Sequence, residues 1–159
     1  MIVNLLIATI DSGLEQVARL LMVPRPELRY IISHQVTDKL FRPVPEALLR
    51  DDVIISQMQG RGIARNRNLA LKLADGDIAL LADDDGVYTP EGINRVLKVY
   101  RNNLDLDGAC FKIGTPAGEP PYKEYATHEY QLDREEHHYI SSLEISFRIK
   151  AVKEKGIHF

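Results

Sequence analysis

The sequence predicts an α/β domain whose mostly parallel sheet is flanked by helices. Short apolar runs indicate buried strands, helical or irregular segments separate them, and polar residues follow their ends. Strands that are apolar on both faces are typical of parallel sheets, because helices cover both sides of such sheets. The four clearest runs are residues 3–8, 28–33, 52–56 and 78–82.

The first half of the chain alternates strand and helix signals. After the first strand, Ser12 and Glu15 have the spacing of a capping box, and apolar residues at helical intervals continue to Pro24. The second strand then stops at residues 33–35. Residues 39–49 are irregular and lead into the third strand.

The second half continues this alternation. Apolar residues at helical spacing predict a helix over 63–74, with Gly76 as its C-terminal cap. Thr89, Pro90 and Glu91 together are typical of a helix start. A fifth strand is expected over 109–113 and a half-buried one over 139–147, separated by a long proline-containing loop.

Composition narrows the class of protein. Of the 159 residues, 45% are hydrophobic and 27% are charged, a balance typical of one globular domain. The net charge of −3 argues against a dedicated nucleic-acid-binding protein, which is usually basic. We therefore expect no nucleic-acid partner.

The number of cysteines and the length of the apolar runs bear on the cellular location of the protein. The single cysteine, Cys110, excludes an internal disulfide and a multi-cysteine zinc site. No apolar run is long enough to span a membrane, and no basic residues precede the first one, so no signal peptide is expected. These features predict a cytoplasmic protein and leave peripheral membrane association open.

An acidic triplet, Asp83–Asp85, follows the fourth strand. Adjacent carboxylates repel one another, and a hard divalent cation such as Mg²⁺ or Mn²⁺ removes that conflict. The side chains of Asp83 and Asp85 share one side if the strand geometry continues. The alternative is a solvated acidic turn that caps the next helix.

A basic cluster opens the helix at residue 63. Guanidinium groups and free backbone N–H groups at a helix start suit an anion such as phosphate. The alternative is a solvated helix face, which we favour for Arg61 and Arg67. Arg67 is expected to point about 200° away from Arg65 on a helix.

A polar cluster follows the first two strands. Side chains of this kind can hydrogen-bond a nucleobase and a ribose, although turn chemistry and helix capping also explain them. His137 and His138 lack the spacing of a helical zinc pair, and no nucleophile arrangement or GxxxxGK[ST] loop is present. The members of the cluster are Thr9, Asp11, His34, Gln35 and Asp38.

Three segments, taken in order, carry a resemblance to a known family. They are residues 7–9, residues 62–66 with 68–70 behind them, and residues 76–85. Over residues 3–113 the chain resembles a family 2 glycosyltransferase with a GT-A fold. The pairing of an arginine-asparagine helix with a strand that bears a DxD motif is specific, and residues 141–147 are similar to a strand of some bacterial members.

The resemblance implies roles for individual residues. Glu144 is a candidate catalytic residue on the acceptor side, with an outward-facing strand residue as the alternative, and the base is otherwise unassigned. The second strand departs from the family pattern, which ends in acidic and serine residues. The implied nucleotide-binding residues are Thr9, Asp11, Gln35 or Asp38, Arg65, Asp83 and Asp84, and the implied ligands of Mn²⁺ or Mg²⁺ are Asp85 and Asp83.

The same resemblance implies an activity. A sugar would move from a nucleotide-diphosphate sugar to the hydroxyl of a saccharide or lipid-linked acceptor, with inversion and with a divalent cation. Residues 1–159 are expected to form a single domain that is truncated on its acceptor side. The alternatives are a non-catalytic nucleotide-sugar-binding module and a metal-dependent nucleotidyltransferase.

Overall fold

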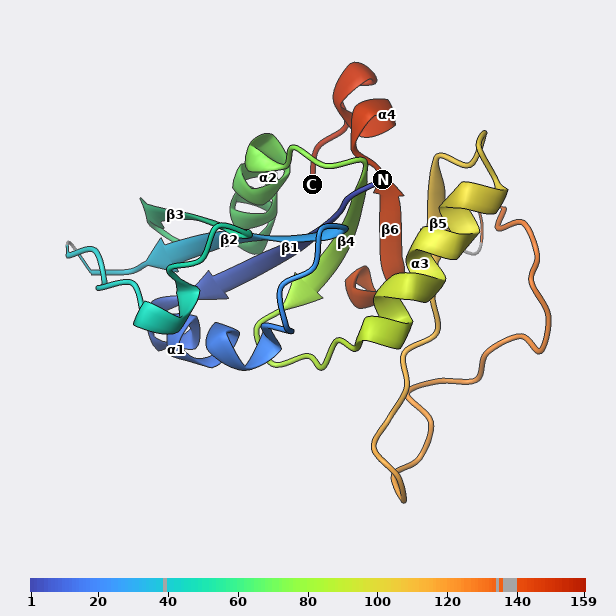
Figure 1. Cartoon of the computed structure of the whole chain (residues 1–159), viewed down its shortest axis with the longest axis horizontal. Coiled ribbons are helices and arrows are strands. Elements are labelled where there is room, and N and C mark those ends of the chain that lie inside the picture. The colour runs from blue at the N-terminus through green and yellow to red at the C-terminus, as the bar shows by residue number, and fades with distance from the viewer. Residues whose placement is uncertain (39, 134, 136–139) are drawn as a thin grey trace.

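The computed structural model describes residues 1–38, 40–133, 135 and 140–159. In this part of the chain one mixed sheet has the strand order β3-β2-β1-β4-β6-β5 (Figure 1). The strands are β1 (Val3–Ile10), β2 (Leu28–Val36), β3 (Val53–Gln59), β4 (Ile78–Asp83), β5 (Gly108–Cys110) and β6 (Ile145–Arg148). The α-helices are α1 (Leu14–Val17), α2 (Ile63–Leu73), α3 (Pro90–Asn102) and α4 (Ile149–Glu154).

The predicted fold class is confirmed. Strands β1 to β4 pair in parallel, and helices lie on both sides of the sheet (Figure 1). The strands at the other edge differ in direction, because β6 runs antiparallel to both β4 and β5. The start of β6 therefore lies near the carboxyl end of β4.

Two clusters of buried side chains hold the helices to the sheet. Alternate residues of β1 point to opposite faces, so Leu5 and Leu6 belong to different clusters. Leu5 packs with residues of α1 and α3, such as Tyr100, whereas Leu6 packs with Leu71 of α2 and Ile149 of α4. This two-sided burial explains why the first and fourth apolar runs do not alternate.

The predicted helix cap is present at the start of α3 and absent at the start of α1. Oγ1 of Thr89 accepts a hydrogen bond from the backbone N–H of Gly92 at 3.1 Å, which confirms the predicted start of α3. The capping box predicted at Ser12 is wrong, since no side chain caps α1. The 3-10 helix η1 (Asp11–Gly13) instead directly precedes α1, and Asp11 in it has a φ of 48°.

The last predicted strand is shorter than expected. Residues 142–144 form the 3-10 helix η5 (Ser142–Glu144), and β6 begins only at Ile145. His137 and His138 lie outside the described residues.

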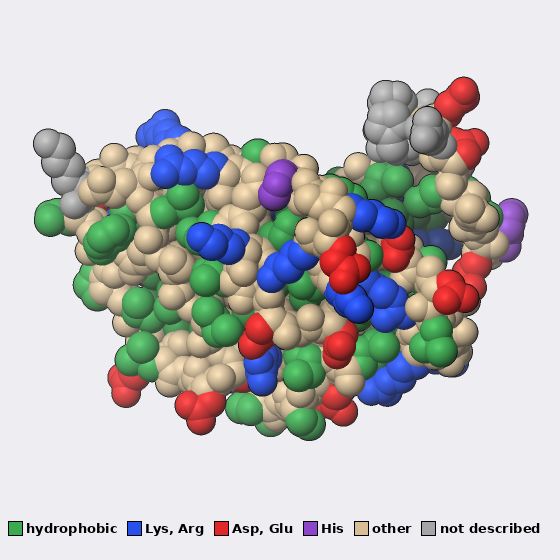
Figure 2. All heavy atoms as spheres, turned by 90° about the horizontal axis from the view of Figure 1, so that it is seen from above, with side chains coloured by type: hydrophobic (Ala, Val, Ile, Leu, Met, Phe, Trp, Pro, Cys, Tyr) green, Lys and Arg blue, Asp and Glu red, His purple; other side chains and the backbone are tan. Residues whose placement is uncertain are grey.

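The surface mixes both signs of charge. On the face drawn in Figure 2, basic and acidic side chains lie next to one another mainly in the middle and right of the view. Among the described residues, none of the helices has the length and apolar character that crossing a bilayer requires.

Candidate functional site

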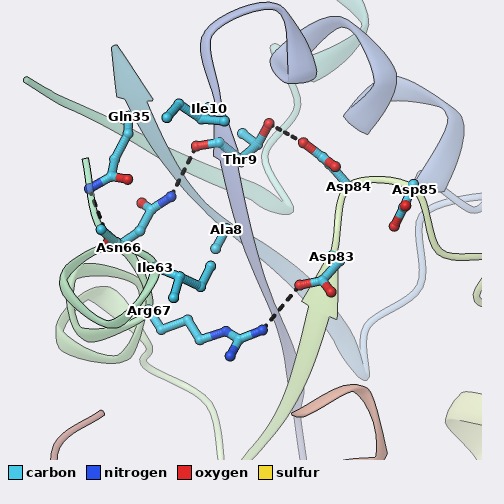
Figure 3. A pocket seen from close by; sticks show the side chains of 11 residues that line it. Ala8, Thr9, Ile10, Gln35, Ile63, Asn66, Arg67, Asp83, Asp84 and Asp85 are labelled. Atoms are coloured by element: carbon cyan, nitrogen blue, oxygen red, sulfur yellow. Dashed lines mark hydrogen bonds and ion pairs between the residues drawn. The ribbon is translucent and has the colours of Figure 1, made fainter. Parts of the chain in front are cut away.

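A pocket of about 390 Å³ opens at the carboxyl ends of β1 and β4 (Figure 3). Strand β1 has β2 on one side and β4 on the other, so the chain order of the sheet reverses here. Ligands of open α/β sheets bind at such a reversal. The lining residues are Ala8, Thr9, Ile10, Gln35, Gly62, Ile63, Asn66, Arg67, Asp83, Asp84 and Asp85.

Thr9 and Asp84, both in the pocket lining, are joined by a hydrogen bond. The hydroxyl of Thr9 donates a hydrogen bond to Oδ2 of Asp84, as the dashed line in Figure 3 shows. The carboxylate of Asp84 is therefore turned toward the end of β1. This bond ties Asp84 to the end of β1; Asp83, Asp84 and Asp85, at the carboxyl end of β4, are called the acidic corner below.

Asn66 joins α2 to strands β1 and β2. Its side-chain N–H donates to the carbonyl oxygen of Thr9 at 2.9 Å, and its Oδ1 accepts from the hydroxyl of Ser33. Asn66 is 2% exposed, so these hydrogen bonds satisfy a buried amide. The start of α2 is thereby fixed against the pocket.

Arg67 lies in the pocket, and the expectation that it is solvated is wrong. Its Nη2 lies 3.2 Å from Oδ1 of Asp83 and donates to Oγ of Ser142 at 2.8 Å. Its side chain is only 15% exposed. Arg65, by contrast, is exposed and is not among the lining residues.

The predicted polar cluster is partly assembled. Gln35 lies within β2, is buried, and donates from Nε2 to the carbonyl of Gly62 at 3.2 Å. Asp38 is exposed and pairs with Arg42 at 2.9 Å instead. Thr9 and Gln35 thus line the pocket, whereas Asp11 and Asp38 do not.

Asp11 and His34 form a support beside the pocket. The backbone N–H and the hydroxyl of Thr37 both donate to the Asp11 carboxylate at 2.8 Å, and these bonds lower the pKa of Asp11. Nε2 of His34 lies 2.9 Å from the carbonyl oxygen of Asp11. Burial lowers the pKa of His34, which favours the neutral ring.

Asp85 is the carboxylate of the triplet that remains available. It makes no hydrogen bond or ion pair within the described part of the chain, whereas Asp83 and Asp84 each have a partner. Mg²⁺ usually takes one or two protein carboxylates and completes its shell with water and substrate phosphates. One available carboxylate beside a second one fits this pattern, although no cluster of three or more such side chains is found among the described residues.

Glu144 lies outside the pocket lining, in η5. Its Oε2 accepts from Nζ of Lys123 at 2.7 Å and from the backbone N–H of Ser141 at 2.6 Å. The alternative of an outward-facing strand residue is wrong, because Glu144 is 2% exposed. The S-x-x-E spacing of residues 141–144 is the sequence signal that could have predicted this capping box.

These observations define a GT-A-type α/β domain with a pocket where the strand order reverses. The model of glycosyl transferase family 2 matches residues 6–155, and the chain therefore belongs to that family. A comparison with the curated proteins gave no match.

Solved structures of similar fold come from Staphylococcus aureus TarS. The structure of TarS 1–349 in complex with UDP-GlcNAc has a TM-score of 0.76 and 19% identity, over 100% of this chain and 48% of that one. A second structure of TarS 1–349 has a TM-score of 0.72, 18% identity and coverage of 100% and 50%. A structure titled simply as TarS has a TM-score of 0.75, 19% identity and coverage of 100% and 30%. This chain thus spans about half the length of TarS 1–349, and the likeness shows the fold.

Proposed function

We propose that this chain forms the donor site of a glycosyltransferase that uses a nucleotide-diphosphate sugar. The observation that carries the proposal is the convergence of Thr9, Arg67 and the acidic corner at one pocket of a family 2 domain. The structural relative was solved with UDP-GlcNAc, which supports uridine nucleotides as the first probes.

The walls of the pocket suit different parts of such a donor. Thr9 and Gln35 line the pocket as polar, largely buried side chains, and Ile10 and Ile63 add exposed apolar surface next to them. Polar and apolar groups in this combination suit a nucleobase and a ribose. Arg67 and the acidic corner suit the diphosphate, directly and through a cation.

Asp85 and Asp83 would hold the divalent cation, Mn²⁺ or Mg²⁺. When bound, this ion would neutralise negative charge on the departing nucleoside diphosphate. The chain's own residues orient the donor: Asn66 fixes the start of α2, and the Thr9–Asp84 hydrogen bond fixes the corner after β4. A donor sugar that is bound in a fixed orientation reacts faster, because the entropy cost of orienting it has already been met on binding.

The transfer itself is proposed to invert the anomeric centre. An acceptor hydroxyl would attack from the face opposite the leaving diphosphate, and a carboxylate base would take its proton. Glu144 is poorly suited to be that base, because Lys123 and Ser141 already bind its carboxylate. The acceptor that receives the sugar would be a saccharide or a lipid-linked group.

Thermal unfolding in the presence of nucleotides tests the proposal. A ligand at 100 times its Kd stabilises the native state by about 2.7 kcal/mol, which raises the Tm of a domain of this size by about 5–10 °C. We expect this rise with UDP and UDP-GlcNAc in the presence of Mn²⁺, and a smaller one with uridine. Preference for nucleoside triphosphates would favour a nucleotidyltransferase, and no rise with any nucleotide would refute the proposal.

Release of UDP distinguishes transfer from simple binding. Incubation with UDP-GlcNAc, Mn²⁺ and a panel of saccharide and lipid-linked acceptors should release UDP in an acceptor-dependent manner if the chain itself carries the whole activity. Donor binding without release would favour the non-catalytic module.

A further inference from the structure

Arg67 is the cation that faces the ligand space. Among the described residues that line the pocket, it alone is positively charged, while three neighbours are aspartates (Figure 3). A pocket whose other charges are carboxylates repels an anionic ligand unless a cation is present. Arg67 is therefore the protein group on which binding of an anion depends.

The present contacts use only part of the guanidinium group. Both contacts, to Asp83 and to Ser142, go through Nη2. Nε is buried and has no hydrogen-bond partner within the described part of the chain. A buried N–H without a partner is unfavourable, so a rearrangement that satisfies it lowers the free energy.

The contact with Asp83 is a single one and is easily exchanged. Arginine binds carboxylates and phosphates most strongly through two parallel N–H groups. Here one nitrogen faces one carboxylate oxygen at 3.2 Å, and the Asp83 side chain is 36% exposed. A phosphate that presents two oxygens to the Nε and Nη groups would compete well with this pair.

We propose that Arg67 is the phosphate-binding residue of this pocket and that a nucleoside diphosphate displaces Asp83 from it. The proposal rests on the proposed function and goes beyond it, because it gives the ion pair a role. In the free protein Arg67 and Asp83 neutralise one another. When the diphosphate binds, Arg67 turns to its oxygens and the carboxylate of Asp83 is released to bind other parts of the ligand.

The exchange predicts opposite effects for its two partners. Arg67→Gln removes the phosphate ligand, so UDP affinity should fall by at least about tenfold, the lower limit for a hydrogen bond to a charged group. Asp83→Asn removes the competitor and a repelling charge, so UDP affinity measured in chelator should rise. Uridine, which has no phosphate, should bind Arg67→Gln and the wild type equally.

Calorimetry on six chains provides the test. Wild type, Arg67→Gln, Arg67→Lys, Arg65→Gln and Lys72→Gln are titrated with UDP, uridine and pyrophosphate in the presence of Mn²⁺. Wild type and Asp83→Asn are titrated with UDP in chelator. Lys72 is the matched control, since it is an exposed cation on the same helix. Arg67→Lys keeps the charge without the paired N–H groups, so its loss should be intermediate. A thermal scan of each variant shows that it is folded.

Each outcome decides a different point. Equal losses for Arg67→Gln and Lys72→Gln, or an equal loss of uridine affinity, would overturn the role of Arg67. A larger loss for Arg65→Gln would transfer that role to Arg65. No gain for Asp83→Asn in chelator would overturn the exchange. If UDP binds but Arg67→Gln leaves its affinity unchanged, this inference fails alone; if neither UDP nor pyrophosphate binds the wild type, the proposed function fails with it.

Discussion

Gly13 lies directly against the carboxylate of Asp84. A β-carbon at position 13 would lie 2.3 Å from Oδ2 of Asp84 and 2.4 Å from Oγ1 of Thr9, far inside van der Waals contact. The backbone at Gly13 has a φ of −58° and a ψ of −26°, which any residue adopts. The glycine is thus required by the close approach of η1 to the acidic corner and not by its own conformation.

Gly13→Ala is expected to separate Thr9 from Asp84. The added methyl group occupies the space of the hydrogen bond, so the unfolding free energy should fall by about 1.5–3 kcal/mol, the range for bonds to charged groups. Urea unfolding measures this loss. Gly92→Ala is the control: a β-carbon there meets only Oγ1 of Thr89 at 3.5 Å, and alanine at this helical position should stabilise the protein. Unchanged stability of Gly13→Ala would contradict the packing described here.

Asn66→Ala is expected to destabilise the protein by about 1–3 kcal/mol, because it leaves buried polar groups of Thr9 and Ser33 without their partner. Denaturant midpoints measure the effect. Lys72→Ala, an exposed change on the same helix, should stay within about 0.5 kcal/mol of the wild type. Equal stability of the two variants would show that the hydrogen bonds of Asn66 are replaced by water.

Asp85→Asn is expected to remove most of the Mn²⁺ dependence of UDP binding while leaving Tm close to that of the wild type. The reason is that Asp85 has no partner to lose within the described part of the chain, yet it lines the pocket. Calorimetry with UDP, with and without chelator, measures the dependence. If the wild type binds UDP equally well in both conditions, the proposed cation site is wrong.

Glu144 is expected to make stability depend on pH in acid. Burial alone raises the pKa of this carboxyl, but the Lys123 ammonium, the Ser141 N–H and the Tyr125 hydroxyl outweigh burial and hold the pKa below its ordinary 4.5. A carboxyl with a lowered folded pKa stabilises the protein above its unfolded pKa, and this stabilisation is lost as pH falls through the folded value. The wild type should therefore lose its advantage over Glu144→Gln as pH falls below about 4.5. A stability difference that stays constant in this range would refute the assignment.

The strands could be predicted because their residues report burial directly. Residues 78–82 are apolar on both faces, and residues 3–8 are so apart from Asn4, as is typical of strands covered by helices; both runs lie within observed strands. The direction of β6 could not be predicted in this way, because an antiparallel pairing with β4 depends on contacts far apart in the chain. The case of η5 is different: its residues alternate as a strand would, and the local S-x-x-E spacing of residues 141–144 was the signal against a strand.

The site shows a different limit. The opposite directions of Arg65 and Arg67 follow from helix geometry, but the sequence does not say which direction faces the sheet. In the first turns of α2 the apolar Ile63 is 53% exposed at the pocket, whereas the polar Asn66 is buried. Tertiary hydrogen bonds to Thr9 and Ser33 set the rotation of α2. The spacing of residues along the helix therefore does not predict which side of α2 faces the sheet.

The antiparallel edge of the sheet has a consequence for how this domain can change in evolution. The backbone N–H of Phe111, just after β5, donates to the carbonyl of Glu144, just before β6, at 2.8 Å. The stretch between them therefore leaves and re-enters the sheet at one point, on the side where the pocket opens, and its described part reaches well beyond the strands (Figure 1). Doubling the length of such a closed stretch costs only about 0.6 kcal/mol. Insertions and deletions there can remodel the surroundings of the ligand while the strand register stays untouched, so related proteins should diverge in length first at this position.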